Sequence, residues 1–244
     1  MQIVTISYTI IFVLTSALYI LLESFRTEEI RLKKEITLPI VPLTILKMMP
    51  AILAIIFTII TMPKTSVLYI ILPITFFLFA IGDFFMEIQK PIGILSFGLG
   101  HITISTGYVF ALIEVKEEII ANKIGFIIFG VIIVLILTID AFFFTRYLSR
   151  SSYPEKYQRY KYVALFYESL LSLHLVVASL LTFAVFKINP GIIVIALGIL
   201  LFTISDKIIM IREFHFKPRK SVLLIMAAYY LALFSISLQT IFQY

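Results

Sequence analysis

Two short segments of the chain place a carboxylate inside an apolar stretch in the same local pattern. Residues 78–83 read LFAIGD and residues 201–206 read LFTISD, so the segments end on Asp83 and Asp206. A carboxylate within a membrane helix costs at least about 2.5 kcal/mol, which makes it by default a candidate functional residue. Such an acid can form a buried ion pair, relay a proton, or act as a general acid or base.

The elements that must position these acids are membrane helices. Hydrophobic residues make up 61% of the 244-residue chain and charged residues only 14%, against about 25% in ordinary globular proteins. Stretches of about 20 apolar residues predict eight spanning helices. Their ranges are 3–22, 39–61, 66–88, 91–115, 122–147, 160–186, 190–211 and 220–244. We therefore expect an all-α membrane protein, with residues 1–244 forming a single bundle of eight transmembrane helices.

Positive charges alternate along the connections between these segments. The first, third, fifth and seventh connections contain fourteen Lys and Arg residues, and the other three contain four. The positive-inside rule then predicts that the odd connections are cytoplasmic and that both termini lie outside. The net charge of +6 is mostly a topology signal, and we expect membrane lipids but no nucleic acid as partners. A plasma (inner) membrane is the default location.

Further polar residues reach the level of the two aspartates. A helix rises by about 1.5 Å per residue, so Asp83, Asp140 and Asp206 each lie about 9 Å from a cytoplasmic helix end. Residues on helices of the opposite direction lie about 10 to 15 Å deep, and these are Lys47, His101, Glu168 and Tyr229. Seven polar groups at one depth predict a polar cavity that opens to the cytoplasmic side.

Several of these residues also have a purely structural interpretation. Asp83 and Asp206 can form buried ion pairs, and Lys47 serves equally well as a counter-ion or as a ligand of a substrate phosphate. Lys207 adjoins Asp206 but points about 100° away around the helix, so we expect it to extend to the cytoplasmic interface. Asp140 is expected to reach back towards the basic loop that follows it.

The intramembrane histidines allow more than one role. His101 follows Gly98 and Gly100, which let helices approach closely, so a helix–helix hydrogen bond competes with a role in a site. His174 lies deeper on a mostly apolar face, and we expect it to pack or to hydrogen-bond locally. Two intramembrane histidines cannot form a three-histidine zinc site, although a mixed His/Asp site stays open. We expect no cofactor.

The two aspartate segments suggest an internal repeat. They lie 123 residues apart, close to half of the chain, on helices that are predicted to run in the same direction. A duplicated four-helix unit would produce this pattern, with its two halves related by an axis along the membrane normal. The two carboxylates would then face each other near that axis.

Several short motifs are distributed along the chain. They are Gly82-Asp83, Phe97-Gly98-x-Gly100-His101, Tyr167 followed by Ala178, Phe202-x-x-Ser205-Asp206, Tyr229-Tyr230-Leu231-Ala232, and Lys47 followed by Pro50. Their order and spacing resemble the YhhN family of lysoplasmalogenase-type membrane proteins. The resemblance covers nearly the whole chain.

This resemblance implies a hydrolase that cleaves the vinyl-ether bond of lysoplasmalogens, giving a fatty aldehyde and a glycerophospho-head group. Asp83 and Asp206 would form the acid/base pair, because one protonated carboxyl group can donate a proton while an ionised partner stabilises a cation and activates water. The lysophospholipid would contact the remaining site residues, Lys47, His101, Tyr167, Ser205 and Tyr229.

The alternative function is a proton-coupled transporter or lipid-binding membrane protein, in which the aspartates relay protons. Transporters often carry matched interruptions in two helices, and Pro73 interrupts the third segment without a proline counterpart in the seventh. Small residues such as Gly125 and Gly130 suit packing within one bundle or between subunits, so the sequence fits a monomer and an oligomer equally.

Overall fold

Helices provide the regular structure of the computed structural model, which describes residues 1–31, 40–63, 65, 67–149, 158–186, 189–214 and 221–241. No strand occurs within these ranges. The long helices are α1 (Gln2–Arg31), α2 (Ile40–Thr61), α3 (Leu68–Ile88), α4 (Lys90–Glu114), α6 (Lys123–Ser149), α7 (Gln158–Val185), α8 (Ile193–Phe214) and α9 (Ser221–Leu238). The short helix α5 (Lys116–Ala121) precedes α6, and the 3-10 turn η2 (Pro190–Ile192) precedes α8.

Most of the long helices have the dimensions of membrane spans. In the described part of the chain, seven helices, α1 to α4 and α6 to α8, are long and apolar enough to cross a membrane. The chain is therefore an integral, multi-pass membrane protein, and the expected all-α bundle is confirmed. The eighth span stays a prediction, because the apolar part of α9, Val222–Leu238, is shorter than the others.

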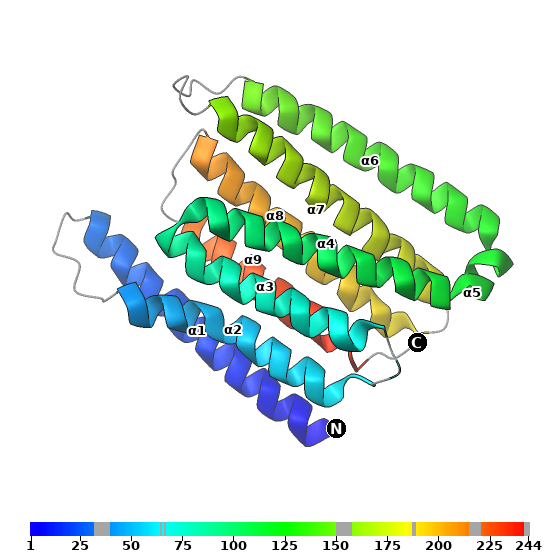
Figure 1. Ribbon diagram of the computed structural model, residues 1–244, viewed down its shortest axis with the longest axis horizontal. Coiled ribbons are helices and arrows are strands. Elements are labelled where there is room, and N and C mark those ends of the chain that lie inside the picture. The colour runs from blue at the N-terminus through cyan, green and yellow to red at the C-terminus, as the bar shows by residue number, and fades with distance from the viewer. Residues whose placement is uncertain are drawn as a thin grey trace.

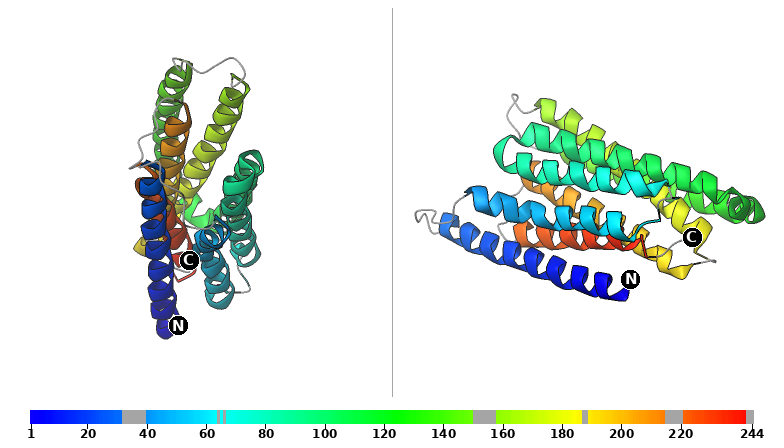
Figure 2. Two further views of the ribbon diagram at one scale, coloured as in Figure 1. Left: turned by 90° about the vertical axis from the view of Figure 1, so that its left-hand side faces the viewer. Right: turned by 60° about the horizontal axis from the view of Figure 1, so that its bottom comes forward.

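The long helices lie side by side and alternate in direction (Figures 1 and 2). The last residues of α1, α3, α6 and α8 and the first residues of α2, α4, α7 and α9 meet at one end of the bundle, on the left in Figure 1. The basic connections 32–39, 150–157 and 215–220, on which the predicted orientation largely depends, lie outside the described residues. The helix directions are those that the alternating charge pattern requires.

The neighbours of each helix follow a related order in the two halves of the chain. Along the first half, α1 packs on α2, α2 on α3 and α3 on α4, and along the second half α6 packs on α7, α7 on α8 and α8 on α9. Between the halves, α4 packs on α7, and α9 packs on both α2 and α1. A duplicated four-helix unit would give the pairs of α4 with α7 and of α9 with α2, and the duplication itself stays a prediction.

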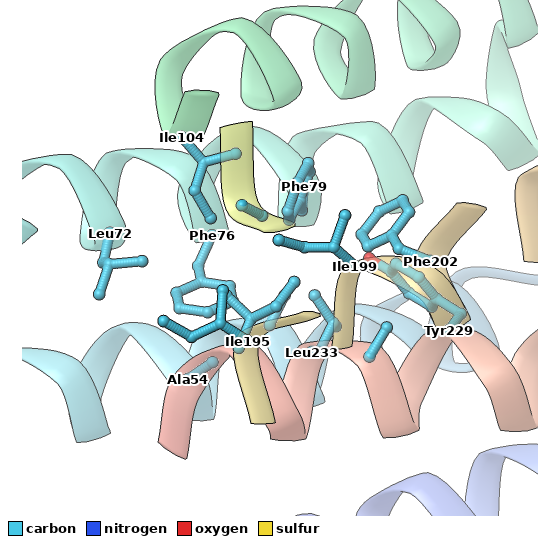
Figure 3. Close-up of a cluster of buried hydrophobic side chains, with 14 of the residues drawn as sticks. Ala54, Leu72, Phe76, Phe79, Ile104, Ile195, Ile199, Phe202, Tyr229 and Leu233 are labelled. Atoms are coloured by element: carbon cyan, nitrogen blue, oxygen red, sulfur yellow. The ribbon is translucent and has the colours of Figure 1, made fainter. Parts of the chain in front are cut away.

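The core lies where α3, α8 and α9 face one another (Figure 3). Phe79, Ile199 and Leu233 are fully buried there, and Phe202 and Tyr229 lie beside each other at one end of the same cluster. The outer faces are apolar as well, and on α6 residues such as Leu135 and Phe142 are more than half exposed. Apolar side chains on both the inside and the outside are what a lipid environment favours.

Glycines set the close approach of α3 and α4. A Cβ atom on Gly82 would lie 2.8 Å from the ring of Phe97, and one on Gly107 would lie 2.7 Å from Cγ2 of Ile71. Gly100 likewise leaves no room for a Cβ beside the ring of Phe79. Because Gly82 precedes Asp83 and Gly100 precedes His101, this contact also fixes the backbone next to two candidate site residues.

Candidate functional site

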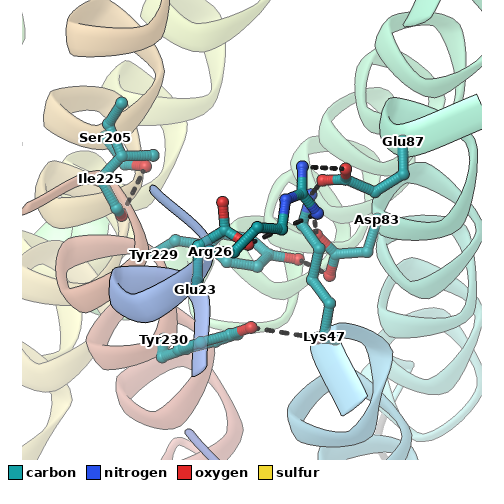
Figure 4. A network of polar contacts seen from close by, with 9 residues as sticks. All are labelled: Glu23, Arg26, Lys47, Asp83, Glu87, Ser205, Ile225, Tyr229 and Tyr230. Atoms are coloured by element: carbon teal, nitrogen blue, oxygen red, sulfur yellow. Dashed lines mark hydrogen bonds and ion pairs between the residues drawn. The ribbon is translucent and has the colours of Figure 1, made fainter. Parts of the chain in front are cut away.

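Three helices converge on Asp83, which is 2% exposed on α3. Tyr229 of α9 donates a hydrogen bond from its hydroxyl to Oδ2 of Asp83 at 2.8 Å (Figure 4). Lys47 of α2 places its Nζ 4.0 Å from Oδ1 of the same carboxyl group. The aspartate therefore has one short contact with a neutral donor and one longer contact with a cation.

Lys47 has a closer acid than Asp83. Its Nζ lies 2.9 Å from Oε1 of Glu87, whose other oxygen is 3.5 Å from Nη2 of Arg26. Arg26 also contacts Glu23 on its own helix, at 3.6 Å. The chain of charges from Glu23 through Arg26 and Glu87 to Lys47 ends beside Asp83 (Figure 4). Within the described residues, each cation of this network is thus matched by an acid other than Asp83.

Asp206 forms a second centre on α8, where it is 7% exposed. Tyr167 of α7 donates its hydroxyl hydrogen to Oδ2 of Asp206 at 2.6 Å. Nε2 of His101, on α4, lies 3.7 Å from the same oxygen, longer than a normal hydrogen bond. This carboxyl group, like that of Asp83, therefore has one short hydrogen bond from a tyrosine hydroxyl and one longer contact with a nitrogen atom, which belongs to an imidazole here and to an ammonium group at Asp83.

Behind His101 lies a second imidazole. Nδ1 of His101 and Nδ1 of His174, on α7, are 2.8 Å apart, and both side chains are completely buried. The ring of His174 stacks on that of Tyr108, with their centres 5.8 Å apart. His174 therefore packs on an aromatic ring and hydrogen-bonds to a candidate site residue of another helix, rather than within its own helix.

Aromatic rings join the two aspartate centres. The ring of Phe202 lies 5.3 Å from that of Tyr229 and 4.6 Å from that of His101, measured between centres. Phe97 packs on Tyr229 at 5.9 Å, and Phe79 packs on His101 at 5.3 Å. The two Asp–Tyr pairs therefore flank one apolar cluster rather than belonging to separate parts of the bundle.

The partners of the two aspartates come from corresponding helices. Asp83 contacts Lys47 of α2 and Tyr229 of α9, whereas Asp206 contacts Tyr167 of α7 and His101 of α4. In the predicted duplication α2 corresponds to α7, and α4 corresponds to α9. Each aspartate thus contacts the helix before it in its own half and the last helix of the other half.

Six of the seven site residues predicted from the sequence belong to these two centres. The exception is Ser205, which is buried and donates its hydroxyl hydrogen to the backbone oxygen of Ile225 at 3.1 Å. This bond ties α8 to α9 immediately beside Asp206. The structure gives Ser205 a backbone contact, and its predicted contact with a substrate stays a prediction.

Glu87 and Arg26 were not predicted as parts of the site. Glu87 lies four residues after Asp83 and so on the same helical face, which was a usable signal. A charge near a predicted helix end ordinarily marks the interface, which hides this signal. Similarly, His174 lies seven residues after Tyr167, two turns along one face of α7.

Lys207 does not extend to the cytoplasmic interface, and that expectation is wrong. Its Nζ lies 3.0 Å from Oε1 of Glu168 on α7 and also contacts Oδ2 of Asp140 on α6. Two acids at the same depth attract the ammonium group more strongly than the interface does. Asp140 and Glu168 are therefore partners of Lys207 that tie α6, α7 and α8 together.

No group of three or more His, Asp or Glu side chains in the described part of the chain is arranged to hold a metal ion.

Comparison with known protein families gives a match. The model of the YhhN family matches residues 43–240, which is well over half of the chain and includes both aspartate centres. No curated protein and no solved structure matches.

Proposed function

The chain belongs to the YhhN family, and we propose on that premise that it hydrolyses the vinyl-ether bond of lysoplasmalogens or related lyso-ether phospholipids. The products are a fatty aldehyde and a glycerophospho-head group. The reaction is acid/base catalysis by Asp83 and Asp206 inside the helix bundle.

The observation that supports this proposal most is the pair of buried carboxyl groups. Each is held by a tyrosine hydroxyl, at 2.8 Å for Asp83 and 2.6 Å for Asp206, and both border one aromatic cluster. Ordered carboxyl groups inside an apolar bundle suit a substrate that has a long alkyl chain and a reaction that needs both a proton donor and a proton acceptor.

The reaction balances with these two groups alone. One protonated aspartate donates its proton to the β-carbon of the vinyl ether, and an oxocarbenium ion forms at the carbon bonded to oxygen. Water then attacks that carbon and gives a proton to the second, ionised aspartate. In the collapse of the resulting hemiacetal, the first aspartate takes the hydroxyl proton and the second protonates the departing glycerol oxygen, which restores both groups.

The remaining site residues fit the other parts of such a lipid. Lys47 is the last residue of the charged network and lies beside Asp83. It is the proposed partner of the substrate phosphate, which would replace Glu87 as the anion paired with its ammonium group. The aromatic rings of Phe97 and Phe202 would pack on the cation-forming end of the alkyl chain, whose remainder lies between helices towards lipid. In the predicted orientation, the site opens to the cytoplasmic side of an inner or plasma membrane.

The test is to incubate the purified protein in detergent with three lysophospholipids that differ only at the first glycerol position. We expect aldehyde release from the vinyl-ether lipid and none from the saturated ether, because only the vinyl ether can be protonated at carbon. Cleavage of an ester analogue at an equal or higher rate would contradict the proposal. If the protein in a vesicle membrane transferred lipid from one side to the other and released no aldehyde, the transporter alternative would replace the hydrolase.

A further inference from the structure

We propose that His101 and His174 form a two-imidazole proton relay that serves Asp206 and makes Asp206, rather than Asp83, the base of the reaction. This inference rests on the proposed function and deepens it. His174 is then a positioning residue that acts through His101, without contact to the substrate.

The geometry of the two rings points to a shared proton. Nδ1 of His101 and Nδ1 of His174 are 2.8 Å apart, a hydrogen-bond distance, so one ring must donate and the other must accept. If His101 donates, its Nε2 carries a lone pair, and this is the atom that faces Oδ2 of Asp206 at 3.7 Å. Nε2 of both rings is buried without a hydrogen-bond partner among the described residues.

A shared metal ion explains the pair less well than a shared proton. Two nitrogen ligands of a tetrahedral zinc ion, each about 2.05 Å from the metal, lie about 3.3 Å apart. The Nδ1 atoms of His101 and His174 are closer than that, at 2.8 Å.

The relay gives the proton taken from water a place to go. When water attacks the oxocarbenium ion, one O–H bond breaks and the proton passes to Asp206. It continues to the lone pair on Nε2 of His101, and the Nδ1 proton of His101 moves to Nδ1 of His174. Asp206 is then ionised again beside the reacting carbon, and the reverse movement returns the proton to the departing glycerol oxygen.

The surroundings of Asp83 favour the opposite role. No imidazole contacts it in the described part of the structure, and its short hydrogen bond comes from the neutral hydroxyl of Tyr229. The nearest cation, Lys47, is 4.0 Å away and is already paired with Glu87 at 2.9 Å. Without an imidazole partner, Asp83 has no relay that could take up a proton from water, which leaves it the role of proton donor.

The first test reads the relay without any substrate. The chain has three histidines, so in a His215→Asn background ¹⁵N-histidine labelling reports His101 and His174 alone. We expect a nitrogen–nitrogen coupling across the hydrogen bond between the two Nδ1 atoms in the solubilised protein. Two rings that show no coupling would overturn the relay, whatever the activity of the protein.

The second test separates a relay from a structural hydrogen bond. His174→Asn places an amide near the position of Nδ1 and can still bond to His101, but it cannot take up a proton, whereas His174→Phe removes both abilities. The relay predicts that both variants lower kcat for aldehyde release by about 10²-fold with little change in KM. The control is Thr182→Val, which alters a buried residue two turns further along α7 and leaves kcat unchanged.

The outcomes distinguish the relay from the proposed function. A parental kcat in His174→Asn with a low kcat in His174→Phe would show a structural bond and overturn the relay, while hydrolysis by the protein would stand. If the parental protein releases no aldehyde, the proposed function fails, and the nitrogen coupling alone then decides whether the two rings share a proton.

Discussion

At the scale of single residues, the defining feature is a carboxyl group held by a tyrosine hydroxyl, found twice. A hydrogen bond contributes about 0.5–1.5 kcal/mol to a neutral group and about 1.5–3 kcal/mol to a charged one, and its loss leaves the carboxyl group free to turn away from its reactive position. Tyr229 holds Asp83, and Tyr167 holds Asp206. We infer that these hydroxyls fix the direction of each acid, while the rings contribute to the aromatic cluster.

Replacement of either tyrosine by phenylalanine isolates that contribution. Tyr229→Phe and Tyr167→Phe remove one hydroxyl each and keep the ring packing. We expect kcat to fall about 10- to 100-fold for Tyr167→Phe, whose partner is the ionised base, and about 2- to 10-fold for Tyr229→Phe, whose partner is the protonated acid. The measurement is the initial rate of aldehyde release at saturating lipid. The matched control is Tyr8→Phe, which removes a buried hydroxyl bonded to Ser237 at 2.6 Å, near the other end of α9. A loss of rate in the control as large as in the two site variants would contradict this assignment.

How much of the site could be predicted depends on how conspicuous each residue is in the sequence. Asp83 and Asp206 stand out because charge is rare in an apolar stretch. The rise per helical residue was enough to predict that His101 and Tyr229 lie at the same depth as these acids. The individual pairs could not be predicted, because Tyr229 and Asp83 are 146 residues apart and meet only through helix packing. Glu87 was missed because a charge near a helix end ordinarily marks the interface.

At the scale of helices, two contacts position the site. The close approach of α3 and α4 at their glycines places Asp83 and His101 near the aromatic cluster. On the other side, Lys207 joins α8 to α6 and α7 through Asp140 and Glu168. One contact depends on the absence of side chains and the other on charge, so different substitutions should disturb them.

Gly82→Ala tests the first contact. The new Cβ would lie 2.8 Å from the ring of Phe97, which packs on Tyr229 and would have to shift. We expect a loss of about 1–3 kcal/mol of stability, seen as a lower midpoint of thermal unfolding in detergent, together with a lower kcat. Gly130→Ala on α6 is the control, because its Cβ would lie 3.5 Å from Leu180, an ordinary contact, and it should unfold like the parent. An unchanged midpoint in Gly82→Ala would show that Phe97 has room to shift.

Lys207→Met tests the second contact. Removal of the ammonium group leaves the 3% exposed Glu168 without its cation. We expect this to lower the free energy of unfolding by about 1–3 kcal/mol. Asp140 adds little to the loss, because it is more exposed and water solvates it. The double variant Lys207→Met/Glu168→Gln removes the stranded charge and should recover most of the loss. The midpoints of thermal unfolding decide between these outcomes, and a double variant as unstable as Lys207→Met alone would rule out the charge explanation.

The helices themselves were more predictable than their contacts. Stretches of apolar residues predicted the spans because a membrane helix must satisfy its backbone within itself, and seven of the eight predicted segments correspond to helices long enough to cross a membrane. The direction in which Lys207 points could not be obtained from its position on α8, because its partners are on α6 and α7. The short helix α5 was not expected, because it forms part of the connection between two spans and is too short to be one itself.

At the scale of the whole molecule, orientation decides from which side a substrate reaches the site. The ends of α3 and α8 that follow Asp83 and Asp206 lie at the same end of the bundle as the last residues of α1 and α6 (Figure 1). The chain contains no cysteine, so a single introduced cysteine reports the side on which it lies. With a membrane-impermeant maleimide, we expect Lys116→Cys to react in intact cells and Ser151→Cys to react only after permeabilisation. The reverse pattern would place the site on the outer side.

The most direct test of the central claim is the rate of aldehyde release from a vinyl-ether lysophospholipid by the parental protein, Asp83→Asn and Asp206→Asn. All three must be compared after the unfolding midpoints show that each remains folded in detergent. We predict that each substitution lowers kcat by about 10²- to 10⁴-fold, because each removes one of the two proton-transferring groups. Hydrolysis at the parental rate by either folded variant would contradict the account.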